Sequence, residues 1–315
     1  MKIAYIGGHW HINIGNSFYN LGALSFLRNT FPQHEIFFVP DPPQELWQGV
    51  DSDYKVIPNL DCDLFVFCGP SFNKFLPLVY RETFELLKSK NKKIAFLSVG
   101  ASEYTETEAE FVIDFLSRYP VEFITTRDKS TYELYKNRMQ SHIHDGICTS
   151  MYLNECNPVA NINGKFYVFN FSYFSEPIIN YVAGEYLHQK RGFRSFQQEF
   201  LGTKIIRTCS SAAKPFSSLI YNRPNLYWSD LPDGYLSIYK SANIVFSDRV
   251  HSCCAALSLG GTAMYFKLSS RSSDGRNRLF DKLGVSEIFH RPQKLNVNYI
   301  DDEKAKMATF LNGIL

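Results

Sequence analysis

The feature that most constrains the fold is a repeated pattern of apolar run, small-residue turn and helical segment. In the first half of the chain, apolar runs rich in β-branched and aromatic residues predict buried strands at 3–6, 35–39, 63–68, 93–99 and 122–126. Four of these strands run into turns that contain Gly, Ser or Arg. Strands that alternate with helices form parallel sheets, so these turns should share one carboxyl edge.

The second half repeats the pattern after a segment rich in Asn, Pro and Gly at 154–164, which we interpret as a linker. The apolar patterns predict strands at 165–172, 203–207, 226–228, 244–246 and 262–267, and helices at 178–190, 235–242, 278–284 and 303–313. A chain of 315 residues is also long for one core.

The predicted fold is therefore α/β, with two Rossmann-like parallel-sheet domains that face a cleft, the architecture of GT-B enzymes. We expect an N-terminal domain at 1–155 and a C-terminal domain at 163–315, with the last helix able to pack back on the N-terminal domain. This comparison of folds does not by itself name a reaction.

Composition excludes several classes of protein. The net charge of +2 is too small to indicate a nucleic-acid partner. The seven cysteines form an odd number without a C-x-x-C pair, which favours reduced thiols and a cytoplasmic location. No apolar stretch approaches the length of a membrane span, so we expect a soluble protein, still able to meet a lipid-linked substrate at a membrane surface.

The stretch from Asn243 to Gly261 carries the clearest candidate chemistry. A strand at 244–246 leads into a helix that starts near Val250, and Ser247 or Asp248 is expected to cap it. Arg249 and His251 then lie at a helix N-terminus, where backbone N–H groups and the helix dipole favour anions. In the alternative interpretation, which an isolated Arg-x-His pair favours, Arg249 is solvated and His251 fills a gap.

The first turn, from Gly7 to Asn16, follows the first strand and precedes a helix. Its spacing matches neither the G-x-G-x-x-G dinucleotide fingerprint nor a phosphate-binding loop with its lysine. His9 and His11 have no nearby third ligand, so we favour a polar loop over a metal site. We expect no metal and no cofactor.

Five motifs occur in order along the chain and resemble those of the polysaccharide pyruvyltransferase family. They are Asn13-Ile14-Gly15-Asn16, the strand from Asp63 to Gly69, Ser98-Val99-Gly100-Ala101, Arg127-Asp128-Lys129-Ser130-Thr131 and Arg249-Val250-His251. Lys267, after the next strand, also fits the family pattern.

The resemblance implies transfer of pyruvate from phosphoenolpyruvate to two hydroxyls of a sugar, in a glycan or lipid-linked saccharide, as a cyclic ketal. It implies His251 and Arg249 as catalytic residues, with the acceptor on the N-terminal side and the donor on the C-terminal side. The expected donor-binding residues are Arg249, Lys267, Arg127 and Ser252. The expected acceptor-binding residues are Asn13, Gly15, Asn16, Ser71 and Ser102.

Two alternatives stay open at this point. One is a GT-B glycosyltransferase that binds the diphosphate of a nucleotide sugar with the same helix terminus and Arg249. The other is a non-catalytic carbohydrate-binding member of the fold, in which glycan binding would not depend on His251.

Overall fold

The computed structural model describes residues 1–10, 13–41, 56–69, 71–156, 159–172, 175–189, 196–210, 223–267 and 278–315. His11 lies outside the described residues, so the choice between a polar loop and a metal site at His9 and His11 is not addressed by the structure.

The N-terminal half is a doubly wound parallel sheet with strand order β2-β1-β3-β4-β5-β6. Ile3 of β1 lies in register with Ile36 on one side and Leu64 on the other, which places β1 between β2 and β3. The elements are β1 (Lys2–Gly8), α1 (Gly15–Thr30), β2 (Glu35–Asp41), η2 (Ile57–Asn59), β3 (Leu64–Cys68), α2 (Leu76–Ser89), β4 (Lys93–Val99), α3 (Glu106–Leu116), β5 (Val121–Thr126), α4 (Lys129–Tyr135), β6 (His142–Asp145) and η3 (Thr149–Glu155).

The C-terminal half holds a second sheet with strand order β10-β11-β7-β13-β14-β15, in which β11, β7, β13 and β14 are parallel. The predicted α/β fold with two parallel sheets is therefore confirmed. The elements are β7 (Tyr167–Asn170), β8 (Ile178–Val182), β9 (Glu185–Gln189), β10 (Glu199–Phe200), β11 (Thr203–Thr208), β12 (Leu226–Tyr227), α6 (Asp233–Ser241), β13 (Val245–Ser247), α7 (Val250–Ser258), β14 (Thr262–Tyr265), α8 (Arg278–Lys282), η5 (Ser286–Phe289), β15 (Gln293–Lys294) and α9 (Val297–Asn312).

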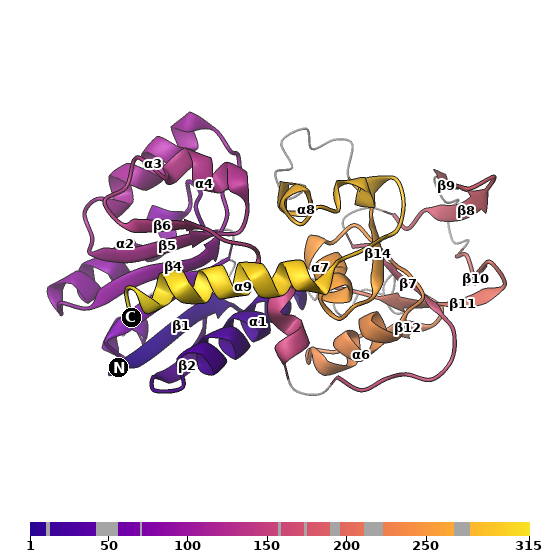
Figure 1. Ribbon diagram of the computed structural model, residues 1–315, viewed down its shortest axis with the longest axis horizontal. Helices are drawn as coiled ribbons and strands as arrows, with labels where there is room; N and C mark the ends of the chain where they lie inside the picture. The colour runs from indigo at the N-terminus through magenta and orange to yellow at the C-terminus, as the bar shows by residue number, and fades with distance from the viewer. Residues whose placement is uncertain are drawn as a thin grey trace.

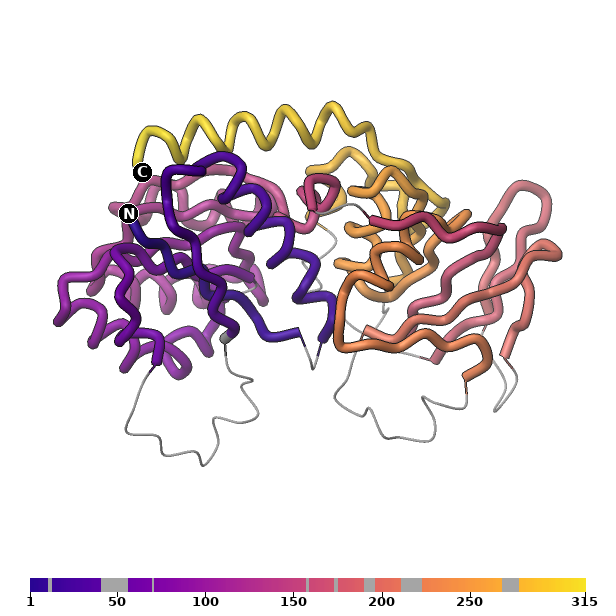
Figure 2. The backbone as a smooth tube through the Cα atoms, turned by 90° about the horizontal axis from the view of Figure 1, so that it is seen from below, coloured from indigo at the N-terminus to yellow at the C-terminus, as the bar shows by residue number. Residues whose placement is uncertain are grey.

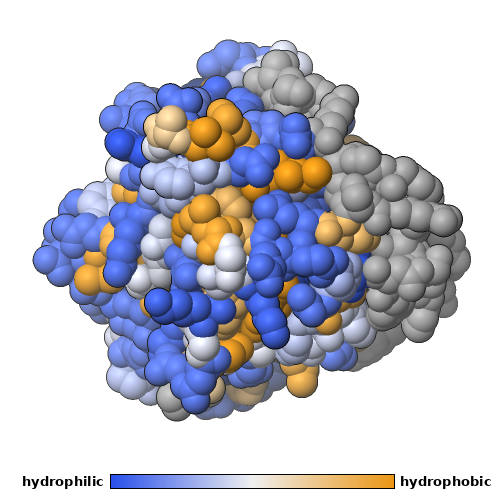
Figure 3. Space-filling model, turned by 90° about the vertical axis from the view of Figure 1, so that its right-hand side faces the viewer, coloured by the Kyte–Doolittle hydropathy of each residue, from blue (hydrophilic) through white to orange (hydrophobic). Residues whose placement is uncertain are grey.

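The helix predicted at 178–190 is wrong, because this segment forms the antiparallel hairpin β8–β9. Ala183 and Gly184 at its tip have φ values of 51° and 88°, a left-handed pair that makes a tight two-residue hairpin turn. Tyr181 and Tyr186 are paired across the two strands, and their tilted rings are in contact with centroids 4.7 Å apart. At this end of the molecule the surface shows separate hydrophobic spots among hydrophilic residues (Figure 3).

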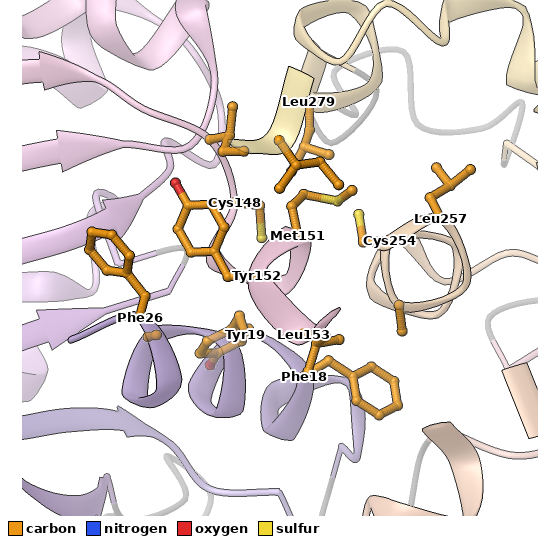
Figure 4. Packing of buried hydrophobic residues seen from close by; sticks show 14 of the residues in the cluster. Phe18, Tyr19, Phe26, Cys148, Met151, Tyr152, Leu153, Cys254, Leu257 and Leu279 are labelled. Atoms are coloured by element: carbon orange, nitrogen blue, oxygen red, sulfur yellow. The ribbon is translucent and has the colours of Figure 1, made fainter. Parts of the chain in front are cut away.

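One hydrophobic cluster extends through both halves, and α1, η3, α7 and α8 meet within it (Figure 4). Gly22 allows α1 to approach η3 closely, since a Cβ added there would lie 1.9 Å from the carbonyl oxygen of Thr149. Ser258 of α7 donates to the carbonyl of Met151 in η3 at 2.8 Å. Both α7 and α1, the helix that follows the turn from Gly7 to Asn16 (the first loop), are therefore held against η3.

Helix α9 runs along both halves and ends over the N-terminal sheet (Figures 1 and 2). The ring of Phe310 stacks on that of His144, with centroids 5.0 Å apart, and meets the ring of Phe123 edge-on, with centroids 6.5 Å apart. Lys282 of α8 adds a link between the halves, because its ammonium donates to the carboxylate and the carbonyl of Asp145.

Candidate active site at the start of helix α7

Helix α7 begins directly after β13, and Arg249 occupies its N-cap position with an extended backbone. The predicted capping by Ser247 or Asp248 is wrong. The buried carboxylate of Asp248 accepts the amide of Ser172 at 3.0 Å, while Ser247 Oγ accepts the amide of Arg249 at 2.9 Å. Arg249, the residue at the N-cap position, makes no side-chain capping bond to α7. The helix start therefore keeps the polarity that favours an anion.

His251, in the first turn of α7, lies against the start of α1 from the other half of the molecule. Its ring meets the ring of Tyr19 edge-on, with centroids 5.2 Å apart. A Cβ added to Gly15 would lie 3.4 Å from His251 Cβ and 3.6 Å from its Nδ1. His251 Nε2 is shielded from solvent. The structure thus brings the predicted catalytic histidine and the predicted acceptor loop into contact.

The end of the first loop, from Asn13 to Asn16, is held by its own side chains and by one hydrogen bond to the second half. Asn13 Oδ1 accepts the amide of Gly15 at 3.1 Å, and Asn13 Nδ2 donates to Asn16 Oδ1 at 3.2 Å. Asn16 Nδ2 donates to the carbonyl of His9 at 2.8 Å. The amide of Ile14 donates to the carbonyl of Ser210 at 2.9 Å. Asn13, Gly15 and Asn16 are therefore held at one place beside α7.

The remaining turns of the first sheet converge on the same edge. The Tyr19 hydroxyl lies between two of them, since a Cβ at Gly8 or Gly69 would stand 2.4 Å or 3.2 Å from its oxygen. The amide of Gly100 lies 3.4 Å from the carbonyl of Gly69. Ser71 follows Gly69 and is half-buried, and Ser102 is exposed after Gly100. The predicted acceptor residues thus share one edge of the N-terminal sheet, as the strand–turn pattern implied.

Arg127 differs from the other predicted donor residues because it lies in the N-terminal half, where it is only 6% exposed. Its guanidinium lies so close to Gly100 that an added Cβ would stand 2.2 Å from Nε. Burial acts to lower the pKa of Arg127, and Tyr104 and Asp128 more than offset this, so the pKa is raised. Arg127 therefore packs against the turn at Gly100 from inside the N-terminal half.

Tyr104 lies next to Arg127 and also contacts the second half. Its hydroxyl donates to Asp128 at 3.1 Å, and burial raises its pKa to about 12 against the lowering effect of Arg127. The guanidinium of Arg278, at the start of α8, lies over the Tyr104 ring at 4.6 Å. Sequence analysis did not single out Tyr104.

Ser252 lies in the interior of the protein, whereas Lys267 lies at its surface. Ser252 is completely buried, and its hydroxyl lies 3.3 Å from those of Ser210 and Tyr239. Its side chain therefore faces the interior of the C-terminal half. Lys267 is exposed. Ser247 pairs with Tyr265 in parallel register, so Lys267 and Arg249 each lie two residues past that pair, at the same sheet edge.

Tyr19 is the site residue that sequence analysis missed most clearly. It lies three and four residues after Asn16 and Gly15, which is the spacing that puts side chains on one helical face. That spacing was the available signal. In the structure its ring contacts His251 and its hydroxyl lies at Gly8 and Gly69.

Within the described ranges, no group of three His, Cys, Asp or Glu side chains is arranged to hold a metal ion. No helix in the same ranges is long and apolar enough to cross a membrane. All seven cysteines are free thiols, and five of them are buried.

Comparison with solved structures gives distant matches over nearly the whole chain. The UDP-GlcNAc 2-epimerase from Neisseria meningitidis bound to UDP-GlcNAc is 10% identical, with 99% of this chain and 100% of that chain covered and a TM-score of 0.52. The UDP-GlcNAc 2-epimerase from Methanocaldococcus jannaschii in complex with UDP-GlcNAc and UDP is 9% identical, with 99% of each chain covered and a TM-score of 0.49. At 10% identity, the match to the Neisseria meningitidis enzyme shows that the two proteins share a fold, and it says nothing about the reaction of this protein.

Comparison with protein families is more specific. No curated protein sequence matches the chain. The family model for polysaccharide pyruvyl transferase matches residues 13–268, which begin at Asn13 of the first loop and extend just past Lys267. With most of its length matched and the five motifs in order on two facing sheet edges, the chain belongs to the polysaccharide pyruvyl transferase family.

Proposed function

We propose that this protein transfers a pyruvyl group from phosphoenolpyruvate to two hydroxyls of a sugar, forming a cyclic ketal and releasing phosphate. The observation that carries the proposal is the contact of His251, at the anion-favouring start of α7, with Gly15 in the loop of Asn13 and Asn16. The titratable ring of His251, the positive charge of Arg249 and a polar loop from the other half of the molecule meet there.

The donor needs fixed positive charge, because phosphoenolpyruvate carries a phosphate and a carboxylate. Arg249 and Lys267 follow adjacent parallel strands at one edge and would bind these groups. The α7 N-terminus adds backbone N–H groups and the positive end of a helix dipole. Arg127, buried behind Gly100, would contribute through the turn it packs against.

His251 is the proposed general acid. Protonation of the methylene carbon of phosphoenolpyruvate makes a methyl group and leaves C2 electron-poor, so that one sugar hydroxyl can form a C–O bond there. The second hydroxyl then bonds to C2 as the C–O bond to phosphate breaks, and phosphate carries away the electron pair. The two hydroxyl protons are released, one of them restoring the acid.

The acceptor would lie on the N-terminal side. Asn13 and Asn16 carry amide groups, and Ser71 and Ser102 carry hydroxyls, which are suited to hydrogen bonds with sugar hydroxyls. Gly15 places the loop of Asn13 and Asn16 next to His251. We propose a glycan or lipid-linked saccharide as acceptor, no cofactor, and a cytoplasmic location that suits seven free thiols.

A ligand screen tests the proposal. Phosphoenolpyruvate should raise the melting temperature, while nucleoside diphosphates and nucleotide sugars should not, and phosphate release should require a glycan acceptor. Stabilisation by a nucleoside diphosphate instead would favour a glycosyltransferase. Glycan binding without turnover, and unaffected by loss of His251, would favour a carbohydrate-binding protein.

A further inference from the structure

A buried polar cluster lies beneath the first turn of α7. We call it the Asn170 cluster, and it consists of Asn170, Thr208, Ser210, Tyr239, Ser247 and Ser252. Asn170 Nδ2 lies 2.7 Å from Thr208 Oγ1, 3.0 Å from Ser210 Oγ and 3.1 Å from the Tyr239 hydroxyl. Asn170 Oδ1 accepts from Ser210 and Ser247, each at 3.1 Å. One amide thus joins the ends of three strands, β7, β11 and β13, to helices α6 and α7.

This cluster is completely enclosed, since none of its members is more than 1% exposed. Apolar residues of similar shape could fill such a place at little cost in stability, or even with a gain. A fully satisfied buried network, by contrast, favours one arrangement of the groups it connects, because each unmade hydrogen bond is costly there. Because the cluster lies directly below the candidate site, we infer that its role is to fix the positions of the site residues above it.

Two members of the cluster act on the start of α7. Ser247 Oγ accepts the amide of Arg249 at 2.9 Å, which fixes the N-cap residue. Ser252 directly follows His251, and its hydroxyl is held by Ser210 and Tyr239, each at 3.3 Å. These hydrogen bonds from the Asn170 cluster therefore fix the rotation of the first turn of α7 about the helix axis, and with it the direction of the His251 side chain.

A third member reaches the other half of the molecule. The carbonyl of Ser210 accepts the amide of Ile14 at 2.9 Å. Ile14 immediately precedes Gly15, which lies against His251. The same cluster thus fixes both sides of the contact between the catalytic helix and the first loop.

We propose that Asn170 is a positioning residue that holds His251 and Arg249 in place against the Gly15 loop. Its effect on turnover rests on the proposed function, whereas its effect on the His251 ring does not. Neither the family motifs nor the sequence pattern singled out this residue.

The first test observes the His251 ring by NMR of protein with ¹³C-labelled histidine, with the signal assigned from its loss in His251→Gln. Ser252→Ala removes one cluster hydroxyl, and its neighbour Cys253→Ala removes one equally buried sulfur outside the cluster. Asn170→Ala and Ser252→Ala should shift the His251 resonance, and Cys253→Ala should leave it near its wild-type position. An unmoved resonance in the first two, or an equal shift in all three, overturns the proposal whatever the substrate is.

The second test is kinetic. Turnover should fall roughly 10- to 100-fold in Asn170→Ala, the scale expected for a misplaced catalytic group. In a His251→Gln background the same change should cost a smaller fold loss than in wild type, because the part of its effect that passes through His251 is already lost. A purely structural role predicts the same fold loss in both backgrounds and would contradict the proposal. Ser252→Ala serves in the same cycle if Asn170→Ala does not fold.

If wild-type protein shows no turnover with phosphoenolpyruvate, the proposed function fails while the resonance measurement still decides the role of Asn170. The two failures are therefore distinguishable.

Discussion

The contact between Gly15 and His251 gives a graded prediction. A Cβ at Gly15 would stand 3.1 Å from Asn13 Oδ1, 3.4 Å from His251 Cβ and 3.6 Å from His251 Nδ1. In Gly15→Ala this crowding is mild, and a gain in helix propensity of at most about 1 kcal/mol opposes it. We therefore expect the free energy of unfolding to stay within about 1 kcal/mol of wild type.

Gly15→Val should act on catalysis. The methyl groups of valine extend about 1.5 Å beyond Cβ. A methyl carbon directed at His251 would therefore lie roughly 2–2.5 Å from the Cβ or Nδ1 atom of the histidine, well inside the optimal separation of about 3.5–4.0 Å. The histidine must then move by about 1 Å, and turnover should fall about 10²-fold while donor affinity changes much less. Steady-state phosphate release from phosphoenolpyruvate gives the rate, and calorimetry gives the affinity.

The matched control is Gly313→Val, at the end of α9, where φ is −76° and an added Cβ meets only the Phe310 and Thr309 carbonyl oxygens, at 3.5 Å and 4.0 Å. Its turnover should equal that of wild type. A folded Gly15→Val protein with wild-type turnover would refute the reasoning, because the loop and His251 could not then form one site.

Three further predictions concern binding, packing and pH. Arg249→Ala should weaken phosphoenolpyruvate binding by about 1.5–3 kcal/mol, as measured by calorimetry, through loss of a charge-assisted hydrogen bond; unchanged affinity would remove Arg249 from the donor site. Gly22→Ala should lower the free energy of unfolding in urea by about 1–3 kcal/mol or more, because the new methyl would lie 1.9 Å from the Thr149 carbonyl oxygen; wild-type stability would contradict this packing. Burial, with a smaller effect of Lys282, lowers the pKa of His144, on which Phe310 is stacked. Below the unfolded-state pKa of about 6.5 the unfolded chain binds this proton more readily than the folded chain. The free energy of unfolding should therefore be steady above that pH and decrease as the pH falls toward the folded-state pKa. His144→Asn should flatten this dependence between about pH 8 and pH 5, and an equally steep dependence in the variant would contradict the assignment.

The sequence predicted those parts of the fold that depend on neighbouring residues. Strands such as Leu64–Cys68 and the small-residue turns after them are local patterns, and the parallel arrangement follows from their alternation with helices. The segment that forms the hairpin at Ile178–Gln189 is hard to recognise as strands, because the spacing of its apolar residues also suits a helix. Ala183–Gly184 was the turn signal that should have decided for strands.

Only the part of the site that depends on neighbouring residues could be predicted from the sequence. Arg249 and His251 are adjacent to a strand–helix turn, so their place at a sheet edge could be inferred. The burial of Arg127 depends on a close approach to Gly100, and the position of Asp248 depends on the amide of Ser172, both tertiary contacts. The surroundings of Asn170 likewise come from residues up to 82 positions away in the chain.

The most direct test of the account compares wild type with His251→Gln in phosphate release from phosphoenolpyruvate with a glycan acceptor, alongside donor binding by calorimetry. Glutamine keeps much of the size and some of the hydrogen bonding of histidine but cannot transfer a proton at neutral pH. We predict that turnover falls by roughly 10²–10⁴, the usual contribution of a general acid, while donor affinity changes much less. Near-normal turnover in the variant would contradict the account and leave His251 with a structural role at the start of α7.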